Sequence, residues 1–357
     1  MKKLSRITIQ IIGGANVATI LLMLLIGHAD MIQPQTFPKL SNLGLLFPAI
    51  LAINFCFLIL WAIIKPRFVL IPLLGFVVCY GPVRRYMPLN IPHDPPAGSI
   101  KVLSYNVWYF AGWEDRTKPN VILEYIKHQN ADIVCLQESM PNEVGQEQID
   151  SIIKPVYQYN DTIQNGGNSI SFYSKYPILS HERIEYKSKG NMSAAFRIRV
   201  KGRDVIVINN HLETTELSPE EKNKFKALVK GKLETDTATQ TSKWLISHLG
   251  EQTRKRSYEA EAVARYIAYH RGTPMIVCGD FNDSPISYAH RTIGKGLIDC
   301  YVSTANGPGV SYHKSGMYFR IDNIFCTDDF TPYACRVDNS IGNSDHYPIM
   351  CWLKMER

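Results

Sequence analysis

Six short apolar segments downstream of residue 98 each end in a carboxylate, amide or imidazole side chain. A single Asp or Asn in such a place commonly caps a turn or a helix. Six of them in one domain instead suggest that neighbouring strands bring these groups together at one edge of a sheet. The endings are Ser104-Tyr-Asn106, Cys135-Leu-Gln-Glu138, Ile208-Asn-Asn-His211, Cys278-Gly-Asp-Phe-Asn282, Arg320-Ile-Asp322 and Ser344-Asp-His346.

Such a set of side chains suits metal-assisted hydrolysis. Carboxylate and amide oxygens are the ligands that Mg²⁺ or Mn²⁺ prefers, and imidazoles can move protons or carry charge. The cysteines do not show the spacing of a zinc site. Four of them, Cys135, Cys278, Cys326 and Cys351, lie in β-like apolar segments, where we expect small buried thiols. An even cysteine count would permit disulfides in an oxidising compartment, but the sequence assigns no pair.

The chemistry-bearing residues occur in an order that resembles the endonuclease/exonuclease/phosphatase superfamily. The resemblance covers nearly all of residues 99–357. It implies a four-layered α/β sandwich, in which two central mixed, largely antiparallel sheets are flanked by helices and the site lies at one sheet edge. The shared motifs are Leu103-Ser-Tyr-Asn-Val-Trp108, Leu136-Gln-Glu-Ser139, Ser171-Phe-Tyr-Ser-Lys-Tyr-Pro-Ile178, Asn210-His-Leu212, Gly279-Asp-Phe-Asn-Asp283, Arg320-Ile-Asp322 and Ser344-Asp-His-Tyr-Pro348.

The resemblance also implies metal ligands and an acid–base group. Glu138 matches the principal ligand of a Mg²⁺ or Mn²⁺ ion, with Asn106 and Asp345 also near the metal. Asp280 matches a carboxylate that either activates the attacking water or protonates the leaving oxygen. Asn282 matches a group that holds a phosphate oxygen and stabilises charge in the transition state.

Two histidines and a third carboxylate complete the expected catalytic set. His346 would contact the scissile phosphate, either as a base or as a charged donor, and Asp322 would orient it. His211 matches a phosphate contact or general acid. The structural alternatives are that Asn106 and Asn282 cap turns and that His211 is a satisfied buried histidine. The neighbouring Asn210 and Asp283 are expected to form turns.

The segments that must position these residues alternate between short strands and helices. Several connections are too short for parallel crossovers, so many strands should be antiparallel. Helices are expected over 119–129 and 256–270, and Ser218-Pro-Glu-Glu221 has the form of a capping box. Residues 212–260 are expected to form two solvated helices. The predicted strands are 100–105, 133–136, 169–173, 195–200, 205–209, 275–278, 320–325 and 349–353.

The N-terminal region is strongly apolar and reads as a membrane anchor, residues 1–88, with about three transmembrane helices. The runs 7–26 and 43–64 contain 20 and 22 residues without a charge. At about 1.5 Å per residue, each can cross a hydrocarbon core about 30 Å thick. The run 68–83 is borderline, and a buried hairpin or an interfacial helix stays open for it. A Pro-rich linker, residues 89–98, leads to the catalytic domain, residues 99–357.

The basic residues beside these runs indicate an orientation. Lys2, Lys3 and Arg6 precede the first run, and Lys65 and Arg67 lie between the second and third. Because positive charge is enriched on the cytoplasmic side, both places should be cytoplasmic. Three crossings would then put the catalytic domain on the extracytoplasmic side of an integral membrane protein. Arg84 and Arg85 weigh against this orientation, since they would follow the third run on the outer face.

Charge does not identify the substrate. The chain has a formal net charge of +7, but eight Lys or Arg face only two Asp in residues 1–98, while the remainder is nearly neutral. A nuclease would favour a basic face. Five lysines could supply a local patch, although a solvated helix face is the preferred interpretation: Lys222, Lys224, Lys226, Lys230 and Lys232.

The predicted function is therefore hydrolysis of a phosphoester of unknown class, preferably a phosphodiester, by a catalytic domain tethered to a lipid bilayer. A nuclease acting on DNA or RNA is an alternative without support from charge. A non-catalytic binding protein of the same fold is a second alternative. It would be expected to lack Glu138, Asp280 or His346, and all three are present.

Overall fold

Two six-stranded sheets stack face to face in the C-terminal part of the chain. The computed structural model describes residues 6–111, 117–142, 144–215, 217–314 and 316–356. The first sheet has the order β11 (Phe330–Val337), β12 (Ile349–Met355), β1 (Ile100–Asn106), β2 (Ile133–Gln137), β4 (Asn168–Ser174) and β3 (Tyr159–Asn165). The second has the order β5 (Ile178–Ile184), β6 (Met192–Val200), β7 (Arg203–His211), β8 (Met275–Asp280), β10 (Asp322–Cys326) and β9 (Ile298–Asp299).

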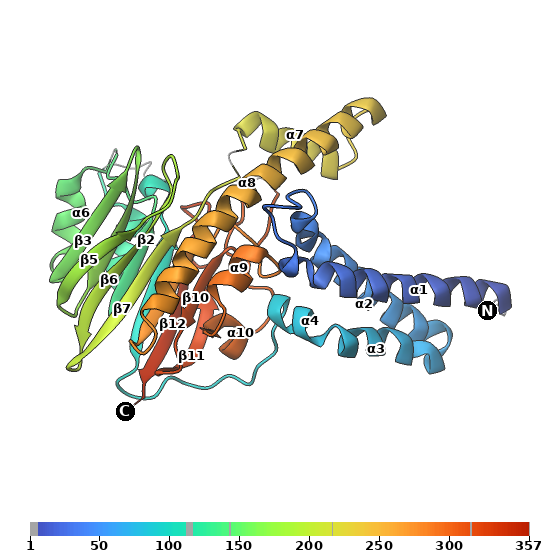
Figure 1. Ribbon diagram of the computed structural model, residues 1–357, viewed down its shortest axis with the longest axis horizontal. Coiled ribbons are helices and arrows are strands. Elements are labelled where there is room, and N and C mark those ends of the chain that lie inside the picture. The colour runs from blue at the N-terminus through green and yellow to red at the C-terminus, as the bar shows by residue number, and fades with distance from the viewer. Residues whose placement is uncertain (1–5, 112–116, 143, 216, 315, 357) are drawn as a thin grey trace.

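Helices cover the outer face of each sheet, and the result is the expected four-layered sandwich (Figure 1). Between the sheets lies an apolar core in which the rings of Phe172 and Phe196 stack with centroids 4.4 Å apart. Helices α5 (Val121–Gln129) and α6 (Gln146–Ile153) pack on the first sheet, and α8 (Thr235–Tyr269) and α9 (Tyr288–Ile293) on the second. Burial of each large apolar side chain in these layers contributes about 1.5–3 kcal/mol.

Both sheets contain parallel and antiparallel strand pairs, and the parallel pairs place the site. The pairs β1–β2 and β7–β8 are parallel, whereas the other strand pairs are antiparallel. Each sheet therefore has two neighbouring strands whose carboxyl ends meet at one edge. Burial on both faces explains why these central strands were recognisable as apolar runs.

Two helical predictions are refined by the structure. The capping box is present: the Ser218 side chain accepts from the backbone of Glu221, and the Glu221 side chain accepts from the backbone of Ser218, at the start of α7 (Pro219–Val229). The helix expected over 256–270 is the second half of α8, which runs unbroken for 35 residues. Residues 212–260 thus hold α7 and most of α8, and α8 buries one face against the second sheet.

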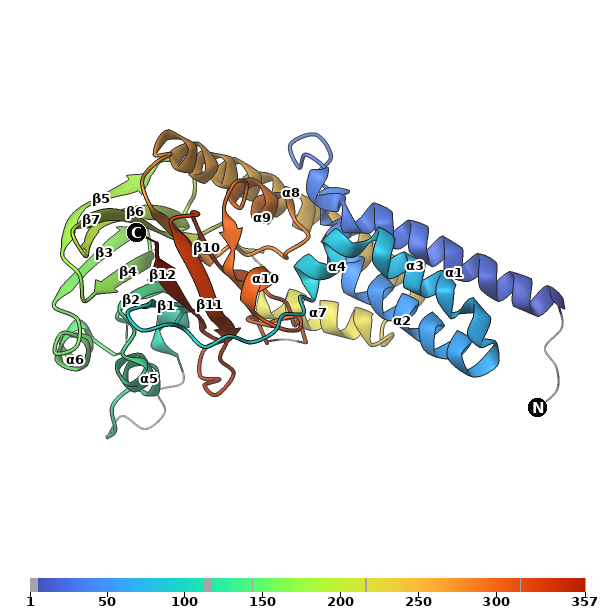
Figure 2. The ribbon, with the colours of Figure 1, turned by 90° about the horizontal axis from the view of Figure 1, so that it is seen from below.

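The N-terminal region forms a helical bundle that extends away from the sandwich (Figures 1 and 2). Helices α1 (Arg6–Gly27) and α2 (Phe47–Ile64) are long and apolar enough to cross a membrane. The third apolar run is not one straight helix: α3 (Leu70–Val78) and α4 (Tyr80–Tyr86) are bent by 74° at a short break. Short helical turns complete the chain: Ala29–Met31, Ser41–Leu46, Pro66–Val69, Trp108–Phe110 and α10 (Cys300–Thr304).

A buried polar network joins the three apolar segments of the bundle. Asn16 on α1 donates to Asn54 on α2 at 3.2 Å and accepts from the indole of Trp61 at 3.2 Å. Asn54 in turn donates to the carbonyl of Pro72 on α3 at 3.1 Å. Gly75 lies so close to Ile20 that a Cβ would stand 2.7 Å from that side chain. Small residues and satisfied polar groups of this kind hold helices together in an apolar surrounding.

The bundle is docked onto the sandwich by the loop between α1 and α2. In this loop, Asn42 accepts from Thr253 of α8 at 2.8 Å, and Gln35 donates to Glu261 at 2.8 Å. Gly44 faces Ile286 so closely that a Cβ would lie 2.0 Å from the Ile286 carbonyl oxygen. The Pro-rich segment after α4 is also attached to the sandwich, since Asn90 donates to the carbonyl of Val302 at 3.1 Å.

Candidate active site

Strand pairing brings the carboxyl ends of the central strands to one edge of the sandwich. His211 at the end of β7 pairs with Asp280 at the end of β8, and Asp280 pairs with Asp322 at the start of β10. In the other sheet, Asn106 ends β1 beside the last residues of β2. Gln137 donates to Asn209 across the sheets at 2.7 Å and fixes the two edges against each other.

Asn106 connects two predicted acidic site residues. Its amide nitrogen donates to Glu138 at 3.1 Å and to Asp280 at 3.0 Å. Its oxygen accepts from the backbone of Trp108 at 3.1 Å, which fixes the orientation of the amide. The first sheet thereby supplies Glu138 and Asn106 to a site whose other half comes from the second sheet.

The backbone at two site residues lies in the left-handed region, which is unusual for residues other than glycine. Glu138 and Asn282 both have φ near 50°. Gly279, just before Asp280, has φ of 127°, and a Cβ there would lie 2.0 Å from the carbonyl oxygen of Asn210. Such conformations cost free energy and persist where the surroundings impose them, most often at functional sites.

Asp322, His346 and Asp280 form a buried chain of side chains. The Nδ1 atom of His346 lies 2.8 Å from Oδ2 of Asp322, and its Nε2 atom lies 3.6 Å from Oδ2 of Asp280. Burial alone would lower the pKa of His346, but the carboxylates of Asp322 and Asp280 more than offset it and raise that pKa to about 10. His346 therefore carries a positive charge at neutral pH.

Asp280 is held by several donors in a buried position. The backbone N–H of Asn282 donates to its Oδ1 at 2.8 Å, and the Asn282 amide lies 3.3 Å from its Oδ2. Burial raises the pKa of Asp280 to about 6, although the nearby histidines and the Asn282 backbone oppose this shift. Burial likewise raises the pKa of Glu138, with the hydrogen bond from Asn106 acting in the opposite direction.

The tautomer of His211 follows from its neighbours. Asn168 accepts from the backbone of Ser169 at 2.7 Å through its oxygen, so its amide nitrogen faces Nδ1 of His211 at 3.1 Å. Nδ1 is then the acceptor and Nε2 carries the proton. Burial lowers the pKa of His211, so the ring is neutral. Its Nε2 atom lies 3.5 Å from Oε1 of Glu138, so the N–H is directed into the site.

The predicted metal ligands, Asn106, Glu138 and Asp345, share no residue with the most compact group of possible metal-binding side chains. Among the described residues, Asp280, Asp322 and His346 form one group whose ligand atoms lie within 4.8 Å of one another and could hold a metal ion. Glu138 lies beside this group through Asn106. Asp345 is half-buried, and its charge contributes to raising the pKa of Glu138.

Sequence reasoning missed Tyr312 and misjudged Lys222. The Tyr312 ring packs edge-on against His346 with centroids 5.2 Å apart. Lys222 of α7 was expected on a solvated face, but it is half-buried and donates to the Tyr312 hydroxyl at 3.3 Å. No local pattern marks either contact, because both join residues far apart in the sequence.

A buried ionic cluster supports the loops that follow β7 and β8. Arg256 of α8 donates to the carbonyl of Glu213 and to the carboxylate of Asp283, both at 2.9 Å. Asp283, expected in a turn, is thus an ion-pair partner. The backbone of Glu213 donates to Glu259 at 2.6 Å. The Asn282 amide donates to the carbonyl of Leu212 at 3.0 Å and joins the two loops.

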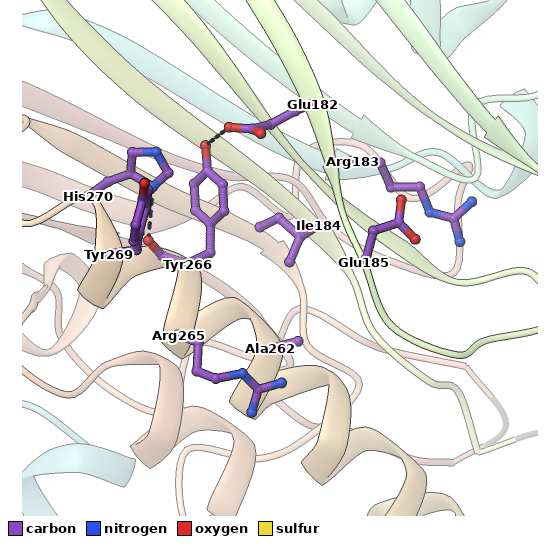
Figure 3. A pocket seen from close by; sticks show the side chains of 9 residues that line it. All are labelled: Glu182, Arg183, Ile184, Glu185, Ala262, Arg265, Tyr266, Tyr269 and His270. Atoms are coloured by element: carbon purple, nitrogen blue, oxygen red, sulfur yellow. Dashed lines mark hydrogen bonds between the residues drawn. The ribbon is translucent and has the colours of Figure 1, made fainter.

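A separate concavity lies between β5 and the C-terminal half of α8 (Figure 3). Tyr266 donates a short hydrogen bond to Glu182 across it, and Tyr269 and His270 stand at one end. None of the predicted site residues lines this pocket. The eight cysteines are all free, and the six in the sandwich are buried, as expected for small apolar side chains.

Family models match both parts of the chain. Residues 103–346 match the model of the Endonuclease/Exonuclease/phosphatase family. Residues 9–86 match a domain of unknown function, DUF8431, whose bounds coincide with the helical bundle. The search of curated proteins found no match.

Solved structures share the fold of the sandwich at low sequence identity. An endonuclease/exonuclease/phosphatase family protein from Bacteroides thetaiotaomicron is 18% identical, with a TM-score of 0.51, and covers 74% of this chain and 100% of its own. A functionally unknown conserved protein from Enterococcus faecalis is 14% identical, with a TM-score of 0.52, over 72% of this chain and 100% of its own. A humanized D. rerio TDP2 is 14% identical, with a TM-score of 0.50, over 72% and 99%.

The family model covers more than half of the chain and includes every predicted site residue. The four-layered fold and the similar solved structures agree with it. The chain belongs to the endonuclease/exonuclease/phosphatase family, whose members hydrolyse phosphoester bonds.

Proposed function

We propose that this protein is a membrane-anchored phosphodiesterase that depends on a divalent metal ion. The observation that carries the proposal is the buried chain of Asp322, His346 and Asp280 next to Asn106 and Glu138. It combines a cationic donor, a carboxylate with a raised pKa and further carboxylates within one sheet edge. These are the groups that hydrolysis of a phosphoester requires.

The donor set fits a hard divalent cation such as Mg²⁺ or Mn²⁺. Several carboxylates crowd a buried site, where their mutual repulsion favours a positive ion. Glu138 would be the principal ligand, with Asn106 and Asp345 beside it. When bound, the ion would neutralise charge that develops on the phosphate oxygens.

Asp280 is the group best suited to accept a proton from the attacking water. Its pKa of about 6 leaves it largely ionised at neutral pH yet basic enough to take that proton. As the water oxygen bonds to phosphorus, the ester bond to the leaving oxygen breaks. The proton on Asp280 then returns to the leaving alkoxide, so the carboxylate is regenerated.

His346 and His211 have complementary roles in this proposal. His346 is protonated, so it donates a charged hydrogen bond to a phosphate oxygen and does not act as the base. Asp322 holds its ring and sustains its charge. The neutral His211 donates through Nε2, and Asn282 fixes the loop that carries Asp280.

Hydrolysis of bis-p-nitrophenyl phosphate tests the enzymatic part. The purified full-length protein should release p-nitrophenol with Mg²⁺ or Mn²⁺ and lose this activity in EDTA. The double variant Asp280→Ala, His346→Ala is the control for contaminating hydrolases. Wild-type activity no higher than that of the double variant would refute the proposal. A panel of DNA, RNA and phospholipids, assayed with the same protein, then separates a nuclease from the other phosphodiesterases.

The docked loop between α1 and α2 supports the predicted topology. This loop contacts α8 and α9, so the adjoining ends of α1 and α2 lie on the side of the catalytic domain. Their opposite ends carry Arg6, Lys65 and Arg67. The bent pair α3–α4 returns the chain to the sandwich and would complete a third crossing. With basic ends in the cytoplasm, the catalytic domain is extracytoplasmic.

The two arginines that weighed against this orientation have protein partners. Arg85 forms an ion pair with the buried Asp30 at 2.5 Å, and Arg84 donates to Asn90 at 3.1 Å. These contacts explain their presence on the outer face without reference to the cytoplasm. A reporter fused after Arg357 tests the side: activity of a periplasmic or secreted reporter is expected, and cytoplasmic reporter activity would refute this orientation.

A further inference from the structure

The α7–α8 hairpin projects from the sandwich in the same direction as the N-terminal bundle. Figures 1 and 2 show that its tip extends past the C-terminal end of α1, which is the end nearer the sandwich. It points to the side toward which α1 and α2 extend. The tip is the turn between Val229 and Thr235. If α1 and α2 lie in a bilayer, this tip therefore points toward the membrane surface.

The hairpin is fixed relative to the bundle by one face of α8. A Cβ at Gly250 would lie 3.0 Å from the backbone of Pro38, and Thr253 donates to Asn42. Both Pro38 and Asn42 belong to the loop that joins α1 to α2. This close backbone contact leaves little room for the hairpin to swing away from the bundle.

The same face of α8 continues toward the tip with exposed residues. Ile246 lies one turn before Gly250, and residues four apart share a helix face. Its side chain is 49% exposed. Lys243, one turn further, is exposed on this face. Trp244 lies on another side of α8, where its ring stacks on His248 with centroids 5.0 Å apart. An exposed isoleucine followed by an exposed lysine on the same helix face suits a membrane interface.

The hairpin as a whole carries a small excess of positive charge, since residues 219–246 hold six lysines against Glu220, Glu221, Glu234 and Asp236. Lys230 and Lys232 lie in the turn itself and are exposed, as are Lys224 and Lys226 on α7. Each lysine close to an anionic membrane surface contributes about 1 kcal/mol to binding. This excess suits anionic phospholipid headgroups.

The hairpin is also connected to the candidate active site. Lys222, near the start of α7, donates to Tyr312, whose ring packs against His346. One short helix therefore joins the surface at the tip to the side chains beside the predicted phosphate contact.

We propose that the α7–α8 hairpin lies in the headgroup layer of the bilayer that holds α1 and α2, so that the active site faces the membrane surface. This inference rests on the proposed membrane anchoring. Its occupant is the phospholipid surface, with Ile246 entering the interface and the lysines contacting anionic headgroups.

Spin labels test the depth of the hairpin. In a Cys56→Ser background, the full-length protein carries a single label at Ile246→Cys, Leu21→Cys or Tyr269→Cys, because the other cysteines are buried. Leu21 is an exposed residue of α1, and Tyr269 is 85% exposed at the far end of α8. Each variant is reconstituted in vesicles of phosphatidylcholine and phosphatidylglycerol, and collisions with oxygen and with a water-soluble nickel chelate are compared.

The expected result is preferential collision with oxygen at Leu21→Cys and Ile246→Cys, and with the nickel chelate at Tyr269→Cys. The hairpin inference alone would be overturned if the label at Ile246→Cys were as accessible to nickel as the label at Tyr269→Cys while Leu21→Cys stayed in lipid. This face of α8 would then be free for a protein partner. Nickel access at Leu21→Cys would overturn the membrane anchoring and the hairpin inference together.

Discussion

Nδ1 of His346 lies 2.8 Å from Oδ2 of Asp322, and both side chains are almost completely buried. The residues are 24 positions apart, yet β10 and the segment before β12 bring them into direct contact. This pair fixes the charge of the imidazole and the direction in which its free nitrogen points. The proposed mechanism depends on it, because the second nitrogen faces Asp280.

Asp322→Asn should lower kcat by roughly 10²–10⁴-fold, the range for loss of a positioned acid or base. The amide is close to the carboxylate in shape but cannot sustain the charge of His346. KM should change little, since other groups also hold the phosphate. Steady-state kinetics with bis-p-nitrophenyl phosphate measure both constants. Asp329→Asn, a half-exposed position outside the site, is the matched control. A wild-type kcat in Asp322→Asn would show that the pair is not part of the mechanism.

Asn168→Ala should lower kcat roughly tenfold, equivalent to about 1.4 kcal/mol of transition-state stabilisation. Removal of the amide frees His211 to place its proton on Nδ1, which directs an acceptor instead of a donor into the site. Asn160→Ala, an exposed position on the neighbouring strand β3, is the control. Equal kcat values for both variants would mean that the tautomer of His211 does not matter for catalysis.

Glu259→Gln should change how stability depends on pH. Burial raises the pKa of Glu259 from about 4.5 to about 8, although the hydrogen bond from the Glu213 backbone opposes the shift. Because the folded chain holds this proton more tightly than the unfolded chain, the stabilisation is lost as pH rises from about 4.5 to about 8. A single proton of this kind changes the free energy of unfolding by up to about 1.4 kcal/mol per pH unit.

Glutamine keeps the hydrogen bond from Glu213 but cannot ionise. The melting temperature of Glu259→Gln in detergent should therefore exceed that of the wild type at pH 8, and the difference should shrink toward pH 5. A constant difference across this pH range would contradict the proposed neutral state of Glu259.

Gly44→Ala should weaken the contact between the bundle and the catalytic domain. The new methyl group would lie 2.0 Å from a backbone oxygen of Ile286, so one element must move. Overpacking of this kind costs about 1–3 kcal/mol. Gly81→Ala is the control, because nothing lies within 4 Å of its added Cβ. The melting temperature of the purified full-length protein should fall only in Gly44→Ala, and equal values would show that this contact does not contribute to docking.

The central strands could be predicted because they are buried on both faces, whereas the edge strands could not. β3 alternates between half-buried and exposed residues, and most of β5 is exposed, so neither forms an apolar run. β11 contains Pro332 and a bulge and was missed for the same reason. Arg320 and Ile321 were placed in a strand that begins only at Asp322.

The site was predicted as far as its residues fall in motifs. Asp280 and His346 could be predicted as site residues because each lies in a recognisable sequence motif, and the fold brings those motifs together. The partners Asn168, Tyr312 and Lys222 were missed because their contacts depend on packing between distant segments. The docking of the bundle through Asp30 and Gly44 could not be predicted either, since nothing in the local sequence identifies Arg291 or Ile286 as partners.

The most direct measurement is the rate of bis-p-nitrophenyl phosphate hydrolysis by the metal-stripped full-length protein as Mn²⁺ is added. We predict no activity without metal, saturable activation of the wild type, and a much higher Mn²⁺ requirement in Glu138→Gln. Asp322→Asn should keep the Mn²⁺ requirement of the wild type while its kcat falls. Full activity in EDTA, or the same Mn²⁺ requirement in Glu138→Gln as in the wild type, would contradict the account.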